Sequence, residues 1–193
     1  MITHIQGKLI EKNPTDVVID CNGVGYFISI SLYTFSQIPD KEHLKLYTHL
    51  QVKEDSHSLY GFSSLAEREI FRLLISVSGI GANIARTMLS SLTPKQVREG
   101  IATSDVALIQ SIKGIGAKTA QRVIIDLKDK ILKIYDIDEV SVSKGNTNKD
   151  EALSALEVLG FVKKQAERVV DKIVMSQPEA SVETIIKQAL KNL

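Results

Sequence analysis

The stretch GIGANIARTMLSSL occupies residues 79–92, and a close copy of it, GIGAKTAQRVIIDL, occupies residues 114–127. Both copies open with Gly-Ile-Gly-Ala and continue with apolar residues at the spacing of an amphipathic helix. The repeat predicts an internal duplication of a helix–turn–helix unit. At a constant offset of 35 residues, the matched pairs are Leu74/Ile109, Ser76/Ser111, Val77/Ile112, Gly79/Gly114, Gly81/Gly116, Ala85/Ala120 and Leu92/Leu127.

Gly-Ile-Gly at the start of a helix is suited to contact with a phosphate group. Glycines let the backbone adopt a positive φ and leave no Cβ to obstruct an approaching ligand. The helix that follows offers unpaired N–H groups and the positive end of its dipole. Ile80 and Ile115 are expected to fix each turn in the core, while Arg86, Lys118 and Arg122 supply cations nearby. One copy could be only a tight turn between helices, but two copies favour phosphate binding.

The basic residues are concentrated in the part of the chain that holds both copies. The net charge of all 193 residues is only +1, yet residues 65–135 carry 11 basic and 6 acidic side chains. Residues 1–64 carry 5 basic and 7 acidic side chains, and residues 151–193 carry 6 of each. This distribution predicts an anionic partner for the central segment.

Residues 1–64 alternate apolar and polar positions with the period of two that half-buried strands show. Turn residues, among them Asn22-Gly23 and Pro39-Asp40, separate the runs. Five short strands of this kind favour a small OB-like barrel. The expected strands are Ile2–Ile10, Val17–Cys21, Tyr26–Ile30, Leu44–Val52 and Ser58–Phe62.

Helical spacing begins at Leu65 and continues through residues 65–135. Residues 136–150 are polar and aperiodic, which predicts a flexible linker, and residues 151–193 have the pattern of three short amphipathic helices. The expected fold class is α+β multidomain, with an N-terminal five-stranded OB-like barrel, a central all-α duplicated domain and a C-terminal three-helix module. Within residues 65–135 the expected helices are Leu65–Ile75, Ala82–Leu92, one opening at Pro94, Asp105–Ile112 and Ala117–Ile134.

Several functional classes lack the residues that they need. No apolar run approaches the roughly 20 residues of a membrane helix, and the first residues do not resemble a secretory signal, so we expect a cytoplasmic protein without membrane contact. GIGAKT resembles a nucleotide P-loop, but Ala117 separates Gly116 from Lys118 and the preceding segment is helical. Cys21 is the single cysteine, and the four histidines form no catalytic pattern. We expect no cofactor, no metal and no catalytic residue.

The paired hairpins resemble helix-hairpin-helix DNA-binding motifs. The order of barrel, hairpins, linker and three-helix module resembles the RuvA family, the junction-binding subunits of the bacterial branch-migration machinery. Agreement extends to GVGY at 23–26, KEDSHSLYGF at 53–62 and LGF at 159–161. The resemblance implies a homotetramer, one or two per junction, that holds a four-way (Holliday) DNA junction open and flat, independent of sequence. It also implies a role in recombination, DNA repair and the SOS response, with a RuvB-type ATPase motor and a RuvC-type resolvase as partners.

The resemblance assigns roles to three groups of residues. Glu54 and Asp55 correspond to an acidic pin at the junction centre, although on their own they would suit a solvated hairpin tip. An apolar surface that grips the motor corresponds to Leu156, Leu159, Phe161 and Leu190, some of which could equally be core. The DNA-phosphate contacts correspond to Gly79, Ile80, Gly81, Asn83, Arg86, Gly114, Ile115, Gly116, Lys118, Thr119, Arg122 and Lys53.

Two positions depart from the family pattern. Asn83 and Ala117 stand where the family often has lysine, which shifts the load to backbone N–H groups, Lys118 and Arg122. We therefore expect a somewhat weaker and more salt-sensitive affinity for DNA.

Two alternative functions compete with junction binding. A helix-hairpin-helix DNA glycosylase would use Lys118 and Asp136, but Asp136 leads into a polar segment without the apolar surroundings of a base pocket. A single-strand binder built on the barrel would need stacking aromatics and positive charge, whereas the barrel segment is net acidic and the chain has no Trp.

Overall fold

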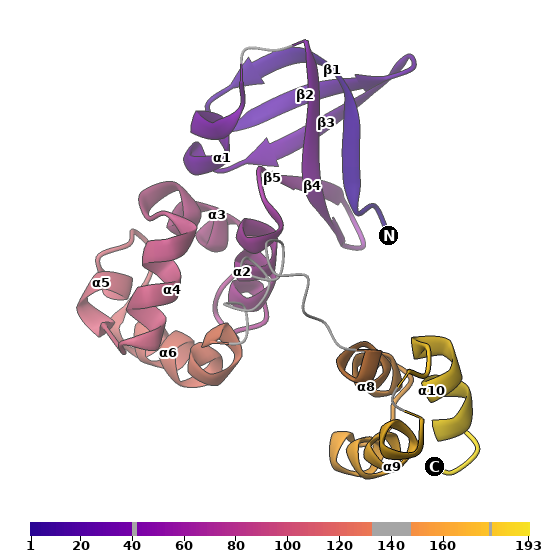
Figure 1. Cartoon of the computed structure of the whole chain (residues 1–193). Coiled ribbons are helices and arrows are strands. Elements are labelled where there is room, and N and C mark those ends of the chain that lie inside the picture. Colours follow the sequence, from indigo (N-terminus) through magenta and orange to yellow (C-terminus); the bar gives the residue numbers. More distant parts are fainter. Residues whose placement is uncertain (40–41, 133–147, 178) are drawn as a thin grey trace. The chain divides into compact units, whose positions relative to one another are not determined.

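The computed structural model describes residues 1–39, 42–132, 148–177 and 179–193. The chain divides into two compact units, Met1–Asp138 and Glu139–Leu193. The first unit contains a β-barrel followed by helices, and the second contains a small helical bundle (Figure 1). The predicted fold class is confirmed by these elements.

The N-terminal strands form a closed barrel in the order β1-β2-β3-β5-β4, with β4 paired back to β1. All neighbours are antiparallel except β3 and β5, which run parallel. Each strand overlaps the one that the alternating pattern predicts. The strands are β1 (His4–Asn13), β2 (Asp16–Cys21), β3 (Val24–Ile30), β4 (His43–Val52) and β5 (His57–Phe62).

The barrel interior is aliphatic because alternate residues of each strand point inward. Val17, Ile19 and Ile28 have no exposed surface, and Leu46 is 1% exposed. The predicted turn at Asn22-Gly23 has positive φ at both residues, 56° and 92°, which is the geometry of a tight two-residue hairpin.

A short helix, α1 (Leu32–Gln37), lies between β3 and β4 and was not predicted. Ser31 caps it, and the Ser31 hydroxyl accepts a hydrogen bond from the Thr34 amide at 2.9 Å. Six residues are too few to establish a helical period, so the segment gives no clear pattern in the sequence.

Five helices follow the barrel in the part of the first unit that the structure describes: α2 (Leu65–Ile75), α3 (Ala82–Ser91), α4 (Pro94–Ala102), α5 (Val106–Gln110) and α6 (Ala117–Ile131). They share one hydrophobic core with the last strand of the barrel. The Phe71 ring of α2 lies 5.1 Å from that of Tyr60 and 4.9 Å from that of Phe62, centroid to centroid. This packing fixes the helices on the barrel.

A buried carboxylate strengthens the same junction. Glu67 of α2 has no exposed surface, and its side chain accepts hydrogen bonds from the hydroxyls of Ser31 and Thr34, both at 2.6 Å. The amide and the hydroxyl of Ser63 also donate to Glu67, each at 3.1 Å. A buried charge is tolerated where its lone pairs are satisfied in this way. Glu67 thereby joins α1, the end of β5 and α2.

The second unit contains α8 (Asn148–Val158), α9 (Lys163–Ser176) and α10 (Val182–Ala189). They pack around a small core that includes Leu156, Val170 and Ile185. The predicted linker, 136–150, is wrong at its end because residues 148–150 form the first turn of α8. The rest of that segment, and Pro178, lie outside the described residues.

Candidate nucleic-acid interface

The two Gly-Ile-Gly segments form nearly identical turns. In the first, the Ile80 amide donates to the Val77 carbonyl at 3.0 Å, and Gly79 has a φ of 95°. In the second, the Ile115 amide donates to the Ile112 carbonyl at 3.1 Å, and Gly114 has a φ of 94°. A positive φ at the third residue of such a turn favours glycine over any side chain.

The isoleucine of each turn is a core residue, as the pattern predicts. Ile80 is 4% exposed and Ile115 is 5% exposed, and both belong to the core of the helical region. Neither side chain is available to a ligand, so these residues contribute rigidity and backbone groups.

The second glycine of each turn caps the helix that follows. Gly81 has φ −85° and ψ 166°, Gly116 has φ −83° and ψ 166°, and neither α3 nor α6 has a side-chain cap. These angles are open to any residue, so the expectation that all four glycines adopt a positive φ is wrong for Gly81 and Gly116.

Protein packing does not require glycine at these two caps either. A Cβ built on Gly81 or Gly116 would meet no heavy atom within 4 Å. Serine or aspartate would cap these helix starts better than glycine by only a few tenths of a kcal/mol, roughly. Glycine at both positions instead leaves the first amides of α3 and α6 accessible to an external oxygen.

The two turns also pack against each other in a reciprocal way. A Cβ on Gly79 would lie 4.0 Å from Cγ2 of Thr119, and a Cβ on Gly114 would lie 4.0 Å from Cγ1 of Ile84. Ile84 and Thr119 are themselves equivalent in the repeat. An approximate two-fold relation therefore connects the hairpins, and each turn lies beside the first turn of the other hairpin's helix.

The hairpins differ in their cations. Lys118 and Arg122 of α6 are exposed, and neither forms a hydrogen bond or ion pair with any residue in the described ranges. In α3, Arg86 is half-buried and donates to the Thr15 carbonyl at 3.3 Å. The equivalent of Lys118 is Asn83, which is uncharged.

Arg86 also affects a carboxylate of the barrel. Hydrogen bonds from Asn13 and Thr15 lower the pKa of Asp16, and the positive charge of Arg86 lowers it further. Arg86, the side chain predicted to contact a phosphate at the first hairpin, therefore interacts with the turn between β1 and β2. This engagement leaves the first hairpin with less free charge than the second.

The acidic residues Glu54 and Asp55 lie at the tip of the β4–β5 hairpin, directly after Lys53. Strand pairing ends at Val52 and His57, and the Lys53 amide donates to the Ser56 carbonyl at 2.8 Å. Glu54, Asp55 and Lys53 are all exposed, and the Ser56 hydroxyl donates to Asp55 at 3.1 Å. The hairpin therefore presents two carboxylates to solvent on a short, hydrogen-bonded turn.

The predicted motor-binding residues divide between core and surface. Leu156 has no exposed surface, so it supports the module from within and cannot itself meet a partner. Leu159 is 59% exposed and Leu190 is 45% exposed, while Phe161 is partly buried against the core. Two neighbouring apolar residues that the sequence did not single out are also exposed: Val158 is 86% exposed and Val162 is 62% exposed.

The backbone explains why these side chains are exposed. Gly160 has a φ of 96°, and the Phe161 amide donates to the Leu156 carbonyl at 3.1 Å, which ends α8 in a Schellman-type turn. Val158 is the last residue of α8, Leu159 and Val162 lie on either side of Gly160, and all three side chains are exposed. Exposed apolar residues so close together in the chain make this end of α8 a candidate contact surface.

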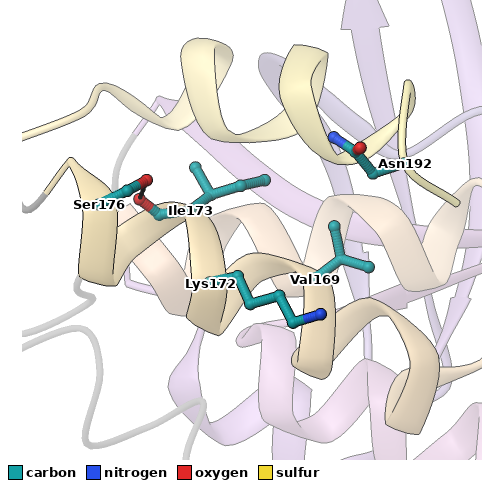
Figure 2. Close-up of a pocket in the computed structure, with 5 residues that line it drawn as sticks. All are labelled: Val169, Lys172, Ile173, Ser176 and Asn192. Atoms are coloured by element: carbon teal, nitrogen blue, oxygen red, sulfur yellow. Dashed lines mark hydrogen bonds between the residues drawn. The ribbon is translucent and has the colours of Figure 1, made fainter.

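A separate cavity of about 330 Å³ lies between α9 and the C-terminal turn. Its lining combines the apolar Val169 and Ile173 with Lys172, Ser176 and Asn192 (Figure 2). The lining holds one cation and no carboxylate, so it lacks the pair of acid and base groups typical of a catalytic site.

Two further features bear on the alternatives. Within the described ranges, no group of three or more His, Cys, Asp or Glu side chains is placed to hold a metal ion. No helix in the same ranges has the length and apolarity to cross a bilayer. Asp136, which a glycosylase would pair with Lys118, lies outside the described residues.

Comparison with known proteins gives matches along nearly the whole chain. Residues 1–61 match the family model described as RuvA N terminal domain, and residues 147–193 match RuvA, C-terminal domain. Between them, residues 71–129 match the SAM-like Helix-hairpin-helix tandem.

Full-length relatives carry the name Holliday junction branch migration complex subunit RuvA. The protein from Flavobacterium psychrophilum is 70% identical over 193 residues, covering 100% of both chains. Those from Christiangramia forsetii and Cytophaga hutchinsonii are 68% identical over 193 residues and 49% identical over 198 residues, covering 100% and 99% of each chain.

Proposed function

The chain belongs to the RuvA family, and we propose that it binds four-way DNA junctions without sequence preference, as the non-catalytic subunit of a branch-migration complex. The observation that carries this proposal is the pair of glycine-capped helices, α3 and α6. Their free amides lie at two reciprocal turns, and the segment that holds them is basic. Amides at helix starts bind phosphate oxygens, which carry no sequence information.

The residues of the two hairpins have different roles in binding. Gly81 and Gly116 admit the phosphate, Gly79 and Gly114 shape the turns, and Ile80 and Ile115 hold them rigid. Lys118, Thr119 and Arg122 add contacts at the second hairpin, Asn83 and Arg86 at the first, and Lys53 at the barrel hairpin. Lysines and arginines that displace counterions from DNA make the affinity fall with rising salt.

The remaining parts have complementary roles in this proposal. Glu54 and Asp55 repel the phosphates that converge at the junction centre, which keeps the strands apart. Four copies form a homotetramer, alone or as a pair of tetramers around one junction, and a RuvC-type resolvase acts on the same DNA. Residues 1–64 and 65–135 form the DNA-binding part, and the module at 151–193 recruits a RuvB-type ATPase.

The surface for the motor comprises Leu159, Phe161 and Leu190, extended by Val158 and Val162. Because Leu156 is core, Leu156→Ala should destabilise the module, whereas Leu159→Ala should leave the module folded. We expect Leu159→Ala to reduce stimulation of the motor's branch migration while junction binding stays normal. Normal stimulation by the folded Leu159→Ala variant would contradict this surface.

A gel-shift comparison of a four-way junction with linear duplex of the same total length tests the central proposal. The full-length protein should bind the junction more tightly at every salt concentration, and its affinity should be independent of the base sequence. Equal affinity for junction and duplex would overturn the proposal. The glycosylase alternative is checked by adding borohydride to the protein mixed with abasic DNA. A covalent protein–DNA product at Lys118 would establish that alternative.

A further inference from the structure

Lys113 is a cation of the second hairpin that neither the family pattern nor the repeat assigns to DNA. It lies between Ile112 and Gly114, at the corner of the turn closed by the Ile115 amide. It is exposed, and it makes no hydrogen bond or ion pair with any part of the chain that the structure describes. The equivalent residue of the first hairpin is Ser78, so this charge is not part of the duplicated pattern.

The reciprocal packing of the hairpins decides which helix Lys113 serves. Gly114, its neighbour, lies against the first turn of α3, because a Cβ on Gly114 would approach Ile84 to 4.0 Å. Lys113 therefore belongs to the second hairpin in sequence, and the turn that carries it lies beside the first turn of α3. A lysine side chain is long and flexible, and its ammonium acts as a point charge for phosphate.

The start of α3 is the place where a cation is missing. Asn83 is neutral, and Arg86 donates to Thr15 of the barrel. The cap at Gly81 is nonetheless as open as that at Gly116, since a Cβ added at either glycine would have no heavy atom within 4 Å. The first hairpin thus has backbone amides ready for a phosphate but no charged side chain in the first turn of α3, since Arg86 lies further along the helix and donates to the Thr15 carbonyl.

We propose that Lys113 binds the DNA phosphate held at the start of α3, and so supplies from the second hairpin the charge that Asn83 does not. This inference rests on the proposed function, because it takes DNA as the ligand of the hairpins. It adds a contact to the binding surface and assigns that contact to the first helix start instead of the second.

The first experiment measures junction affinity of full-length Lys113→Ala as a function of salt. We expect affinity to fall about three- to fivefold at low salt. The negative slope of log K against log salt should become shallower by about 0.9, as for one lost phosphate contact. Lys95→Ala is the matched control, since Lys95 is equally charged but lies on α4, 3.8 Å from Glu99. It should change neither quantity. Unchanged affinity and slope in Lys113→Ala would overturn the inference.

A double-mutant cycle with Asn83→Lys then tests which helix Lys113 serves. If Lys113 compensates for Asn83, the loss caused by Lys113→Ala should shrink to less than about twofold once position 83 is a lysine. An equal loss in both backgrounds would place the contact elsewhere and overturn the assignment to α3. The wild-type measurement separates the two proposals, because absence of junction preference there would instead defeat the proposed function. Thermal melting of each variant confirms that it is folded.

Discussion

The two hairpins share a backbone and differ in charge. Their turn glycines have nearly the same φ, at 95° and 94°, and their cap glycines have the same ψ of 166°. The second hairpin has free cations at Lys118 and Arg122, whereas the first has Asn83 and an arginine bonded to the barrel. Duplication has therefore kept the geometry of the amides and left the side chains free to diverge. The contrast indicates that the backbone, and not the lysine pattern, is the common element of binding.

The most damaging change should be a side chain at a cap. Gly81→Val or Gly116→Val places a bulky group over the free amides, so we expect junction affinity to fall on the order of a hundredfold in either case. Both hairpins should respond equally because their caps are equivalent. The folded state should lose less than about 1 kcal/mol, since a valine is a poor cap but fits the local angles. Binding within about twofold of wild type would show that the caps do not meet DNA.

The turn glycines should produce the opposite result, in which stability changes more than binding. Gly79→Ala or Gly114→Ala forces a Cβ into a backbone with positive φ, at a cost of about 1–2 kcal/mol. Denaturant unfolding should show similar losses for the two variants, because their turns are alike. Unfolding free energies that match those of wild type would mean that the turns relax without strain.

The cations should separate the hairpins. Lys118→Ala combined with Arg122→Ala should weaken junction binding about tenfold or more at low salt and reduce the magnitude of the salt slope by about 1.8, as for two phosphate contacts. Asn83→Ala combined with Arg86→Ala should reduce the slope by no more than about 0.9, because Asn83 is uncharged and Arg86 is the one cation of the pair. Salt titrations of the two double variants measure the difference directly. Equal slopes would remove the electrostatic contrast between the hairpins.

The acidic pin should have the smallest effect, and it should act on both hairpins alike. Glu54→Gln combined with Asp55→Asn removes repulsion toward phosphates, so affinity for duplex and junction should rise about two- to threefold at low salt. The gain should be the same in wild type and in the Lys118→Ala, Arg122→Ala background. Salt above about 0.5 M should abolish the gain, because screening shortens the range of the carboxylates to a few ångström. An unchanged affinity for duplex at low salt would make Glu54 and Asp55 an ordinary solvated turn.

Much of the fold could be predicted because most of its elements show a regular apolar pattern and are separated by turn residues. The barrel strands follow an alternating pattern, and the duplicated hairpins align over a fixed offset, so both could be located from the sequence alone. The helix α1 could not, because six residues do not establish a period. The end of the linker was missed because polar residues 148–150 resemble the preceding segment, yet they begin α8.

The candidate site was less predictable than the fold, because exposure depends on tertiary packing. Leu156 and Leu159 are alike in sequence, but the first has no exposed surface and the second is 59% exposed. The exposure of Val158 and Val162 was not predicted, because it depends on how the end of α8 and the residues after it pack. The sequence presents Arg86 as a free cation, whereas in the structure it is bonded to Thr15. The charge of Lys113 is not repeated in the first hairpin, where the equivalent residue is Ser78. A role at the start of α3 could be inferred only from the packing of Gly114 near Ile84.

The buried carboxylate of Glu67 sets a rule for how this part of the sequence can evolve. Its oxygens accept from two hydroxyls and from the amide and hydroxyl of Ser63, so every neighbouring group is a donor. A glutamine at position 67 would require the Ser31 hydroxyl to accept a hydrogen bond where it now donates one, and an apolar residue would leave the donors unsatisfied. Positions 31, 34, 63 and 67 should therefore vary together among related sequences. A substitution at one of these positions would be tolerated only together with a second one that restores the hydrogen bonds.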